Sequence, residues 1–280
     1  MLHETIGAGG LGYAPCRYGL SRIFFRGPRR ALEAPYAAFI GGTETYGKFI
    51  EHPFPALCEP GLGLPCVNLG IVNAGIDVYV GEPTVTTICR DAAVTVLQLT
   101  GAHNLSNRFY KVHPRRNDRF LSASTVLKAI YQEVDFSEFT FTRHMLGTLF
   151  EISPDRFEIV LNELRNAWAA RMRLLLEHLG SHVVLLWFSE HPLTDEPWNK
   201  SLHPFRADPL FVTREMVEGL RPRVLDVVEV DPSPAARRQR SEGMFYSLTQ
   251  AGAAAELPSV LAHEEAAARL LPVLRNHLHR

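Results

Sequence analysis

The stretch Tyr36–Gly47, YAAFIGGTETYG, joins a short apolar run to a turn rich in glycine. The residues Tyr36–Ile40 are apolar without alternation, which is typical of a strand buried on both faces of a parallel sheet. Gly41 and Gly42 then allow a tight turn at the carboxyl end of that strand, where open α/β sheets bind their ligands. This stretch therefore predicts a buried strand followed by a ligand-binding turn.

Four further apolar runs have the length and composition of buried strands. They are Cys66–Leu69, Val94–Leu99, His182–Phe188 and Val224–Val230. Segments with helical periodicity lie between and after them, of which Phe157–Leu179 and His263–Leu278 are the clearest. Strands that alternate with helices favour a parallel sheet with right-handed crossovers. We therefore predict a single α/β domain over residues 1–280, a three-layer sandwich around a five-stranded parallel sheet in the flavodoxin-like order 2-1-3-4-5.

The connection between the third and fourth predicted strands is about 80 residues long, far more than a crossover needs. We predict a helical insertion or cap, together with the crossover helix, over residues 108–180. Its helices are expected near Ala123–Glu133 and Phe139–Phe150.

Residues 1–35 precede the first strand and are expected to form an N-terminal arm. The arm carries a basic cluster, for which a nucleic-acid or membrane-surface role is the less favoured interpretation because the charge of the whole chain is balanced; we expect no nucleic-acid partner. The cluster consists of Arg22, Arg26, Arg29 and Arg30.

The overall composition argues against several classes of protein. The chain has 29 Lys+Arg and 30 Asp+Glu, a formal net charge of −1, which argues against binding nucleic acid through bulk positive charge. No run of about 18 apolar residues predicts a membrane span, and the N-terminus lacks the pattern of a secretion signal. The four cysteines are scattered without a CxxC pair, and no HExxH motif occurs. We therefore expect a cytoplasmic protein without a metal or another cofactor, and the oligomeric state stays open.

Residues suited to binding and catalysis follow several of the predicted strands. Thr43 lies in the first turn, Gly70 follows the second strand, and His103 and Asn104 follow the third. His263 opens the last predicted helix. Because the carboxyl ends of parallel strands meet at one edge of a sheet, we expect these residues to converge on one pocket that His103 lines. The Thr43 hydroxyl has two interpretations, a reacting group or a cap of the helix that follows.

In their order along the chain, these turns resemble the sequence blocks of the SGNH, or GDSL-type, hydrolase superfamily. The block Gly-Asp-Ser-x-Thr-x-Gly is similar to Gly41–Gly47, and the glycine of the second block is similar to Gly70. The block Gly-x-Asn-Asp is similar to Gly101–Asn104, and the histidine of the last block to His263. The resemblance extends from about Tyr36 to the C-terminus, with a large insertion after the third block.

The resemblance implies a hydrolase site on this sheet. Thr43 would hold the position of the nucleophile, and His263 would be the general base. The Thr43 N–H, the Gly70 N–H and the Asn104 side chain would form the oxyanion hole. The departures from the family pattern are Thr43 for Ser, Gly42 for Asp, Leu105 for Asp, and Val260 where the family has its acid. We therefore expect a divergent bacterial family on this scaffold, one described as a domain of unknown function.

The segment Asn107–Phe120 concentrates positive charge in an otherwise balanced chain, and aromatic residues are interleaved with it. A guanidinium binds sulfate, phosphate or carboxylate through two parallel hydrogen bonds. We therefore predict that Arg115, Arg116 and Arg119 bind an anionic group of the ligand near the turn after the third strand. The alternative is structural, with these arginines paired to nearby carboxylates that hold the inserted helices. The candidate partners are Asp118, Asp135 and Glu138.

Three functions follow from these features. The first is an ester hydrolase or acyl transferase that acts on a polar small molecule or glycan, a carbohydrate or another compound with an anionic group. The second is a transferase that uses a coenzyme A thioester or a nucleotide-activated sulfate, whose phosphates the arginines would bind. The third is a non-catalytic ligand-binding protein on a decayed hydrolase scaffold, which Thr43 and Val260 favour.

Overall fold

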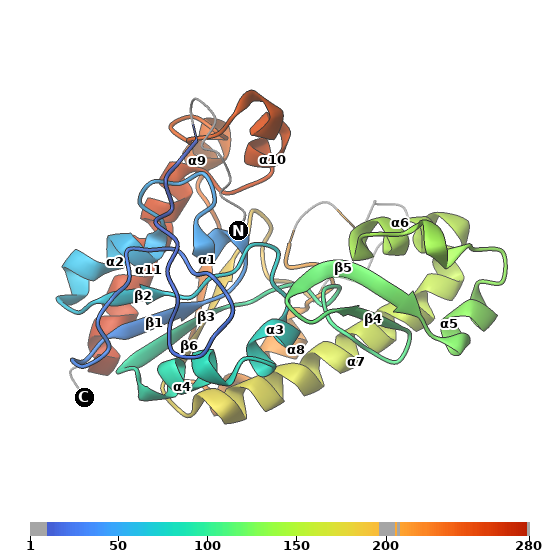
Figure 1. The fold of residues 1–280 in the computed structure, drawn as a ribbon, viewed down its shortest axis with the longest axis horizontal. Coiled ribbons are helices and arrows are strands. Elements are labelled where there is room, and N and C mark those ends of the chain that lie inside the picture. The colour runs from blue at the N-terminus through green and yellow to red at the C-terminus, as the bar shows by residue number, and fades with distance from the viewer. Residues whose placement is uncertain (1–9, 196–204, 206–207, 279–280) are drawn as a thin grey trace.

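Five parallel strands form the large sheet, in the order β2-β1-β3-β6-β7 (Figure 1). The computed structural model describes residues 10–195, 205 and 208–278. The strands are β1 (Ala37–Ile40), β2 (Cys66–Asn68), β3 (Val94–Gln98), β6 (Val183–Phe188) and β7 (Asp226–Val230). Counted along the chain, the order is 2-1-3-4-5, so the predicted flavodoxin-like sheet is confirmed. β1 pairs with both β2 and β3, which places the topological switch point beside β1.

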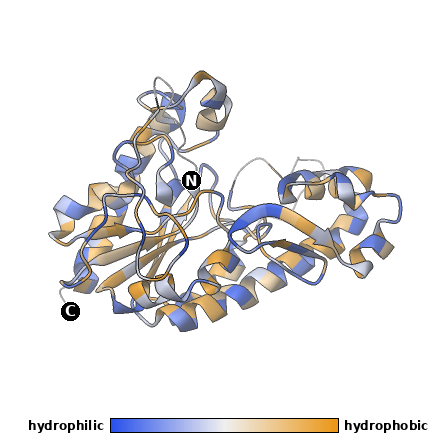
Figure 2. Ribbon diagram, in the orientation of Figure 1, coloured by the Kyte–Doolittle hydropathy of each residue, from blue (hydrophilic) through white to orange (hydrophobic). Residues whose placement is uncertain are grey.

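Both faces of this sheet are buried, because alternate residues of a strand point to opposite sides. In β1, Ala37 and Phe39 belong to one apolar core, whereas Ala38 and Ile40 belong to the other. The first core is covered by α2 (Phe54–Leu62), α9 (Pro234–Gln239) and α11 (Val260–Leu278). The second core is covered by α3 (Ile76–Val80), α4 (Pro83–Asp91) and α7 (Pro154–Leu179). Figure 2 shows the strands of the large sheet as predominantly hydrophobic ribbons between these layers.

The long helix α7 follows the sequence pattern closely. Its start is set by Ser153, whose hydroxyl accepts a hydrogen bond from the Arg156 N–H, and by Pro154 in its first turn. It ends before Gly180, as predicted. The predicted apolar face is buried and consists of Leu161, Leu164, Trp168, Met172 and Leu175.

The inserted segment contains a β-hairpin that was not predicted. β4 (Tyr110–His113) and β5 (Arg116–Ala123) pair antiparallel and form a second sheet. Helices follow, as predicted: α5 (Thr125–Ile130), the 3₁₀ turn η1 (Phe136–Glu138) and α6 (Thr142–Ile152). The first half of β5 is hydrophilic (Figure 2), so it lacks the apolar run from which the other strands were predicted. The predicted helical insertion is thus present and also contains this hairpin, in which the aromatic rings of Tyr110 and Phe120 pack together and provide the apolar face.

The remaining elements are short. They are α1 (Thr43–Tyr46), α8 (Arg214–Glu218), η2 (Arg221–Arg223), η3 (Leu248–Gln250) and α10 (Ala251–Ala255). The N-terminal arm turns back on itself, and Cys16 and Phe25 form an antiparallel bridge within it. Among the described residues, no helix combines the length and the apolar character that crossing a membrane requires.

Candidate functional site

A cavity of about 1070 Å³ opens at the carboxyl edge of the large sheet. The turns after β1 and β3 place Thr43, Glu44, His103 and Asn104 in its wall, and Ser189 follows β6. Helix α6 lines the cavity from the inserted segment, and residues of α10 line it from the C-terminal part of the chain. This position beside the switch point is the usual place for a ligand in an open α/β sheet.

Thr43 is the first residue of α1, and Gly42 is the N-cap. The Thr43 hydroxyl forms no capping hydrogen bond, so the interpretation of Thr43 as a helix cap was wrong. It donates instead to the Asn73 Oδ1 at 3.2 Å and accepts from the Asn73 N–H at 2.9 Å. Thr43 therefore lies in the cavity wall with its hydroxyl bound to the turn after β2.

Gly70 is placed by packing against α1. Its N–H donates to the Asn68 Oδ1 at 2.9 Å, so this amide is already engaged within the turn. A Cβ at this position would lie 2.3 Å from the Tyr46 N. Glycine is therefore required here because two backbone segments approach closely. Gly70 does not line the cavity.

His263 lies in the apolar core behind the cavity wall. Its Nδ1 accepts a hydrogen bond from the Phe54 N–H at 3.2 Å. Its ring stacks on Phe54 and meets the edge of Phe188, which does line the cavity. Burial, together with the positive charge of Arg26, lowers the pKa of His263 to about 3. Within the described chain, no hydrogen bond joins Thr43 to His263, so the pair that the resemblance implies is not formed.

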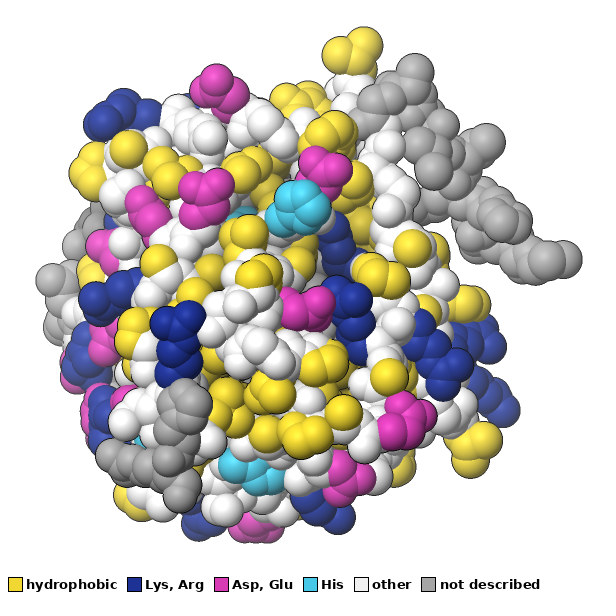
Figure 3. Space-filling model, turned by 90° about the vertical axis from the view of Figure 1, so that its left-hand side faces the viewer, with side chains coloured by type: hydrophobic (Ala, Val, Ile, Leu, Met, Phe, Trp, Pro, Cys, Tyr) yellow, Lys and Arg dark blue, Asp and Glu magenta, His cyan; other side chains and the backbone are white. Residues whose placement is uncertain are grey.

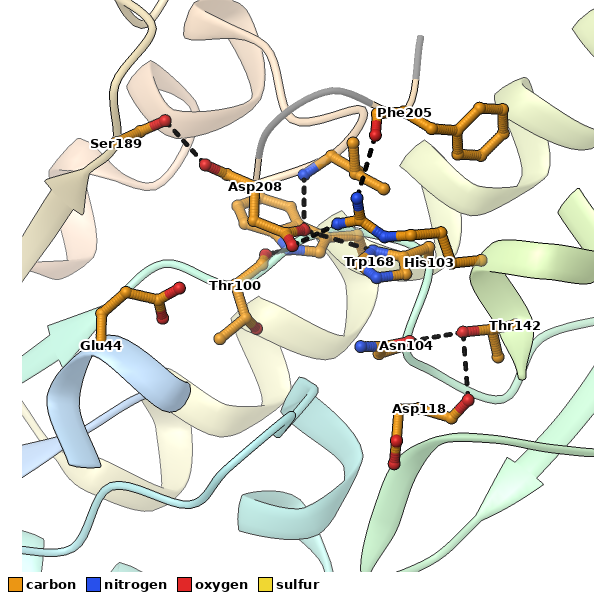
Figure 4. A network of polar contacts seen from close by, with 12 residues as sticks. Glu44, Thr100, His103, Asn104, Asp118, Thr142, Trp168, Ser189, Phe205 and Asp208 are labelled. Atoms are coloured by element: carbon orange, nitrogen blue, oxygen red, sulfur yellow. Dashed lines mark hydrogen bonds and ion pairs between the residues drawn. The ribbon is translucent and has the colours of Figure 1, made fainter. Parts of the chain in front are cut away.

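Asn104 and His103 both line the cavity, as predicted from their turn. The Asn104 Oδ1 accepts a hydrogen bond from the Thr142 hydroxyl at 2.6 Å. This bond leaves the Asn104 amide nitrogen pointing away from Thr142, toward the open middle of the site (Figure 4). Burial lowers the pKa of His103 to about 4, so its imidazole is neutral at physiological pH.

Asp208 lies beside His103 (Figure 4), and Arg143 forms an ion pair with Asp208. The Asp208 Oδ1 lies 3.8 Å from the His103 Nδ1, which is buried without a hydrogen-bond partner. Arg143 of α6 donates to Asp208 and to the Phe205 carbonyl, and the Ser189 hydroxyl donates to the Asp208 carbonyl at 2.7 Å. Arg143 thereby joins the inserted segment to the loop that carries Asp208.

Glu44, like Arg143 and Asp208, is a site residue that the sequence did not predict. Its Oε2 accepts a hydrogen bond from the Gln98 Nε2 at 2.8 Å, and its carboxyl points from α1 toward Thr100 and Asp208 (Figure 4). Burial raises the pKa of Glu44; the Gln98 hydrogen bond opposes this, and the Asp208 carboxylate adds to it. The available signal was its position, a lone carboxyl one residue past Thr43 in the turn after the first strand.

Gln98, at the end of β3, fixes the beginning of α1. Its Oε1 accepts hydrogen bonds from the Gly42 N–H, the Thr45 N–H and the Thr45 hydroxyl. The same amide donates to Glu44, so both ends of this side chain are satisfied. The buried strand β3 thus orients the carboxyl that faces the cavity.

The sequence matches the family described as Domain of unknown function (DUF6473) over residues 1–278. The chain belongs to the DUF6473 family. No curated protein matches it.

Among solved structures, this DUF6473 protein is similar to the lipase Lip_vut3 from a goat rumen metagenome. The sequences are 13% identical, the match covers 86% of this chain and 97% of the lipase, and the TM-score is 0.39. A likeness at this level carries no argument about activity. Membership of the SGNH superfamily stays a prediction.

The three arginines of the basic segment lie outside the cavity of this DUF6473 protein. Arg115 lines a separate hollow with Arg22, Arg116 is exposed, and the Arg119 guanidinium lies 4.5 Å from the ring centre of Phe141. The expected position of these arginines in the wall of the ligand pocket beside Asn104 was therefore wrong, since Arg115 lies in the turn between β4 and β5, and Arg116 and Arg119 lie on β5 outside the cavity lining. The described residues also show no ion pair between these arginines and Asp118, Asp135 or Glu138.

The charges that do line the cavity are mainly acidic in the described part of the chain. The acidic residues are Glu44, Asp118, Glu151, Glu190, Asp208 and Glu256, and the basic ones are Lys48 and Arg143. Arg143 is already paired with Asp208. Groups of three or more side chains suited to a metal ion are absent from the described residues.

Proposed function

We propose that this DUF6473 protein is a hydrolase of polar esters, and that Glu44 is its general acid and base. The observation that carries the proposal is a carboxyl with a raised pKa inside a large cavity at the switch point of the sheet. Carboxyl groups tuned upward toward neutral pH are suited to proton transfer. Asn104 supplies a hydrogen-bond donor on the same cavity wall as Thr43.

In the proposed reaction, the ester carbonyl oxygen accepts a hydrogen bond from the Asn104 amide nitrogen. A water molecule attacks the carbonyl carbon while the Glu44 carboxylate takes one of its protons. The tetrahedral intermediate then collapses, the carbon–oxygen bond to the alcohol breaks, and Glu44 returns the proton to the departing oxygen. Asn104 stabilises the negative charge on the intermediate. With an alcohol in place of water, the same steps transfer the acyl group.

Water is proposed as the nucleophile because of the contacts of Thr43. The hydroxyl of Thr43 donates to an amide oxygen of Asn73, which cannot act as a base. His263, the base that the resemblance implies, is hydrogen bonded to Phe54 within the core. Thr43 is therefore proposed to shape the cavity wall rather than to form a covalent intermediate.

The proposed substrate is a polar compound without a strongly anionic group, such as an acylated carbohydrate. The carboxyl groups of Asp118, Glu190 and Glu256 line the cavity and repel anions, but accept hydrogen bonds from hydroxyl groups. The arginines expected to bind an anion lie elsewhere. This also disfavours the transferase with a phosphate-bearing donor.

The first prediction tests Glu44 with p-nitrophenyl acetate and a panel of acetylated sugars. Glu44→Gln keeps the size of the side chain and its hydrogen bonding, but it cannot transfer a proton. We expect kcat to fall by about 100-fold or more, with a smaller change in KM. For the wild type, activity falls on acidification as Glu44 is protonated. Because the pKa of Glu44 is raised, this fall occurs above the usual pH range of a glutamate.

Two controls accompany this measurement. Glu264→Gln removes an exposed carboxyl of α11 and should leave turnover unchanged. Thr43→Ala should retain turnover within about tenfold if water is the nucleophile, because only a positioning contact is lost. If Glu44→Gln is as active as the wild type, Glu44 is not the acid and base. Loss of all turnover in Thr43→Ala would instead favour covalent catalysis.

A second candidate function is ligand binding without catalysis. The observation that favours it is that the Thr43 hydroxyl is hydrogen bonded to Asn73 and the His263 Nδ1 to Phe54, so these two residues do not form a nucleophile and base pair. In that case the wild type would bind acetylated sugars and hydrolyse none of them. Calorimetric titration and turnover on the same panel separate the two functions.

A further inference from the structure

Arg26 of the N-terminal arm is buried, and its guanidinium is hydrogen bonded to backbone carbonyls. Its Nη1 donates to the Tyr46 and Gly47 carbonyls at 3.2 and 2.5 Å. Its Nη2 donates to the Ile50 and Glu51 carbonyls at 2.7 and 2.8 Å. The side chain is 8% exposed, and no carboxylate pairs with it in the described part of the chain. A buried cation is costly unless it is fully hydrogen bonded, so these four contacts have to be made together.

These carbonyls belong to the end of α1 and to the loop that follows it. Helix α1 has only four residues, and a helix of this length is not stable by itself. The last carbonyls of a helix have no partner within it, and a nearby cation also interacts favourably with the helix dipole. Gln98 holds the beginning of α1, and Arg26 holds its end.

Further contacts join the arm to the same loop. The Phe49 N–H donates to the Tyr13 hydroxyl at 2.8 Å, and the guanidinium carbon of Arg26 lies 5.2 Å from the ring centre of Tyr13. Phe49 has a positive φ of 69°, so it needs such contacts to stay in place. The loop also carries Lys48, which lines the cavity.

We propose that Arg26 is a positioning residue of the site: through the carbonyls of residues 46–51, the N-terminal arm holds α1 so that Glu44 faces the cavity. This inference rests on the proposed function for its effect on turnover. How firmly the backbone of residues 43–51 is held can be measured by amide hydrogen exchange, without any substrate.

The test uses Arg26→Lys in the full chain. Lysine keeps the positive charge, but its single ammonium cannot reproduce a planar fork that reaches four carbonyls. We expect amide hydrogen exchange in residues 43–51 to become at least about tenfold faster, with no change in β3 and β6. On p-nitrophenyl acetate, kcat should fall by about tenfold or more while KM changes little, and the acidic limb of the pH–rate profile should shift.

The matched control is Arg22→Lys, an exposed arginine of the same arm, which should leave exchange and turnover as in the wild type. If Arg26→Lys does not fold, Tyr13→Phe removes the acceptor of the Phe49 N–H and should speed exchange in the same loop. Unchanged exchange in residues 43–51, or an increase spread evenly over the whole sheet, would overturn the inference. If Glu44→Gln were fully active while Arg26→Lys showed faster exchange in residues 43–51, the proposed function would be rejected. The positioning of α1 by the N-terminal arm would still be supported.

Discussion

At the scale of single residues, the site depends on how closely backbone segments approach. The turn after β2 packs directly on α1, and Gly70 is the point of contact. An added methyl group would meet backbone atoms of Tyr46 and Thr45, which cannot rotate away as a flexible side chain does. The same turn places Asn73 against the Thr43 hydroxyl. A change at Gly70 is therefore transmitted to the cavity wall.

Gly70→Ala is predicted to lower the free energy of unfolding by about 1–3 kcal/mol, because it overpacks this contact. Urea denaturation followed by circular dichroism measures this change. Gly252→Ala is the control, since a Cβ there meets nothing within 4 Å. It should leave the free energy of unfolding within about 1 kcal/mol of the wild type, as expected for an exposed helical position. Equal stability of both variants would contradict the close approach at Gly70.

At the scale of elements, α7 supports the turn that carries His103 and Asn104. Trp168 is fully buried in the middle of this helix. Its indole N–H donates to the Thr100 carbonyl at 2.8 Å (Figure 4). Arg171, about one turn later, donates to the Ser106 carbonyl and pairs with Asp77 of α3. The crossover helix thus holds both ends of the turn after β3.

Trp168→Phe keeps an aromatic ring but removes the donor to Thr100. We expect a loss of about 1–3 kcal/mol in the free energy of unfolding, because the Thr100 carbonyl loses its hydrogen-bond donor and some volume in the core is left empty. Thermal and urea unfolding are the measurements. Arg173→Ala, on the exposed side of the same helix, should change stability by no more than about 0.5 kcal/mol. If Arg173→Ala lowered the free energy of unfolding as much as Trp168→Phe, the effect would come from substitution anywhere in α7 and not from the hydrogen bond to Thr100.

At the scale of the whole molecule, two neutral histidines are buried in a protein whose surface charge is mixed. Figure 3 shows basic and acidic side chains interspersed over the face that it presents. Inside, burial lowers the pKa of His263 to about 3 and that of His103 to about 4, from an ordinary value of 6.5. Between those values and pH 6.5 the unfolded chain binds protons that the folded chain does not. Acidification therefore favours unfolding.

Stability is predicted to be full above pH 6.5 and to fall as the pH is lowered toward 4. Each histidine should contribute a slope of about 1.4 kcal/mol per pH unit, or about 2 kcal/mol between pH 6.5 and 5. Urea unfolding across this range measures the slope. His263→Gln should have a shallower slope whatever its absolute stability, and His52→Gln, an exposed histidine, should keep the slope of the wild type. Identical slopes in all of these proteins would show that the buried histidines do not control the acid response.

The sequence by itself determined the large sheet and the place of the site. Continuous apolar runs such as Tyr36–Ile40 are typical of strands covered on both faces, and their alternation with helices predicted a parallel, doubly wound sheet, whose flavodoxin-like order the structure confirms. The order in turn placed the turns of Thr43 and Asn104 around one cavity. The two ends of α7 could also be predicted from the sequence. Ser153 and Pro154 favour a helix start and Gly180 a helix end through interactions with the neighbouring backbone.

Only the tertiary structure decided which side chains face the cavity. His263 and Glu44 are both polar residues near predicted turns of the site. His263 is enclosed between Phe54 and Phe188, whereas the hydrogen bond from Gln98 orients Glu44 toward the cavity. The predicted arginines belong to the β4–β5 hairpin and lie outside the cavity lining. The N-terminal arm packs against the end of α1, where Arg26 donates to the Gly47 carbonyl. These outcomes depend on contacts between segments far apart in the chain. A local pattern carries no information about such contacts, because their free energy arises only when the segments meet.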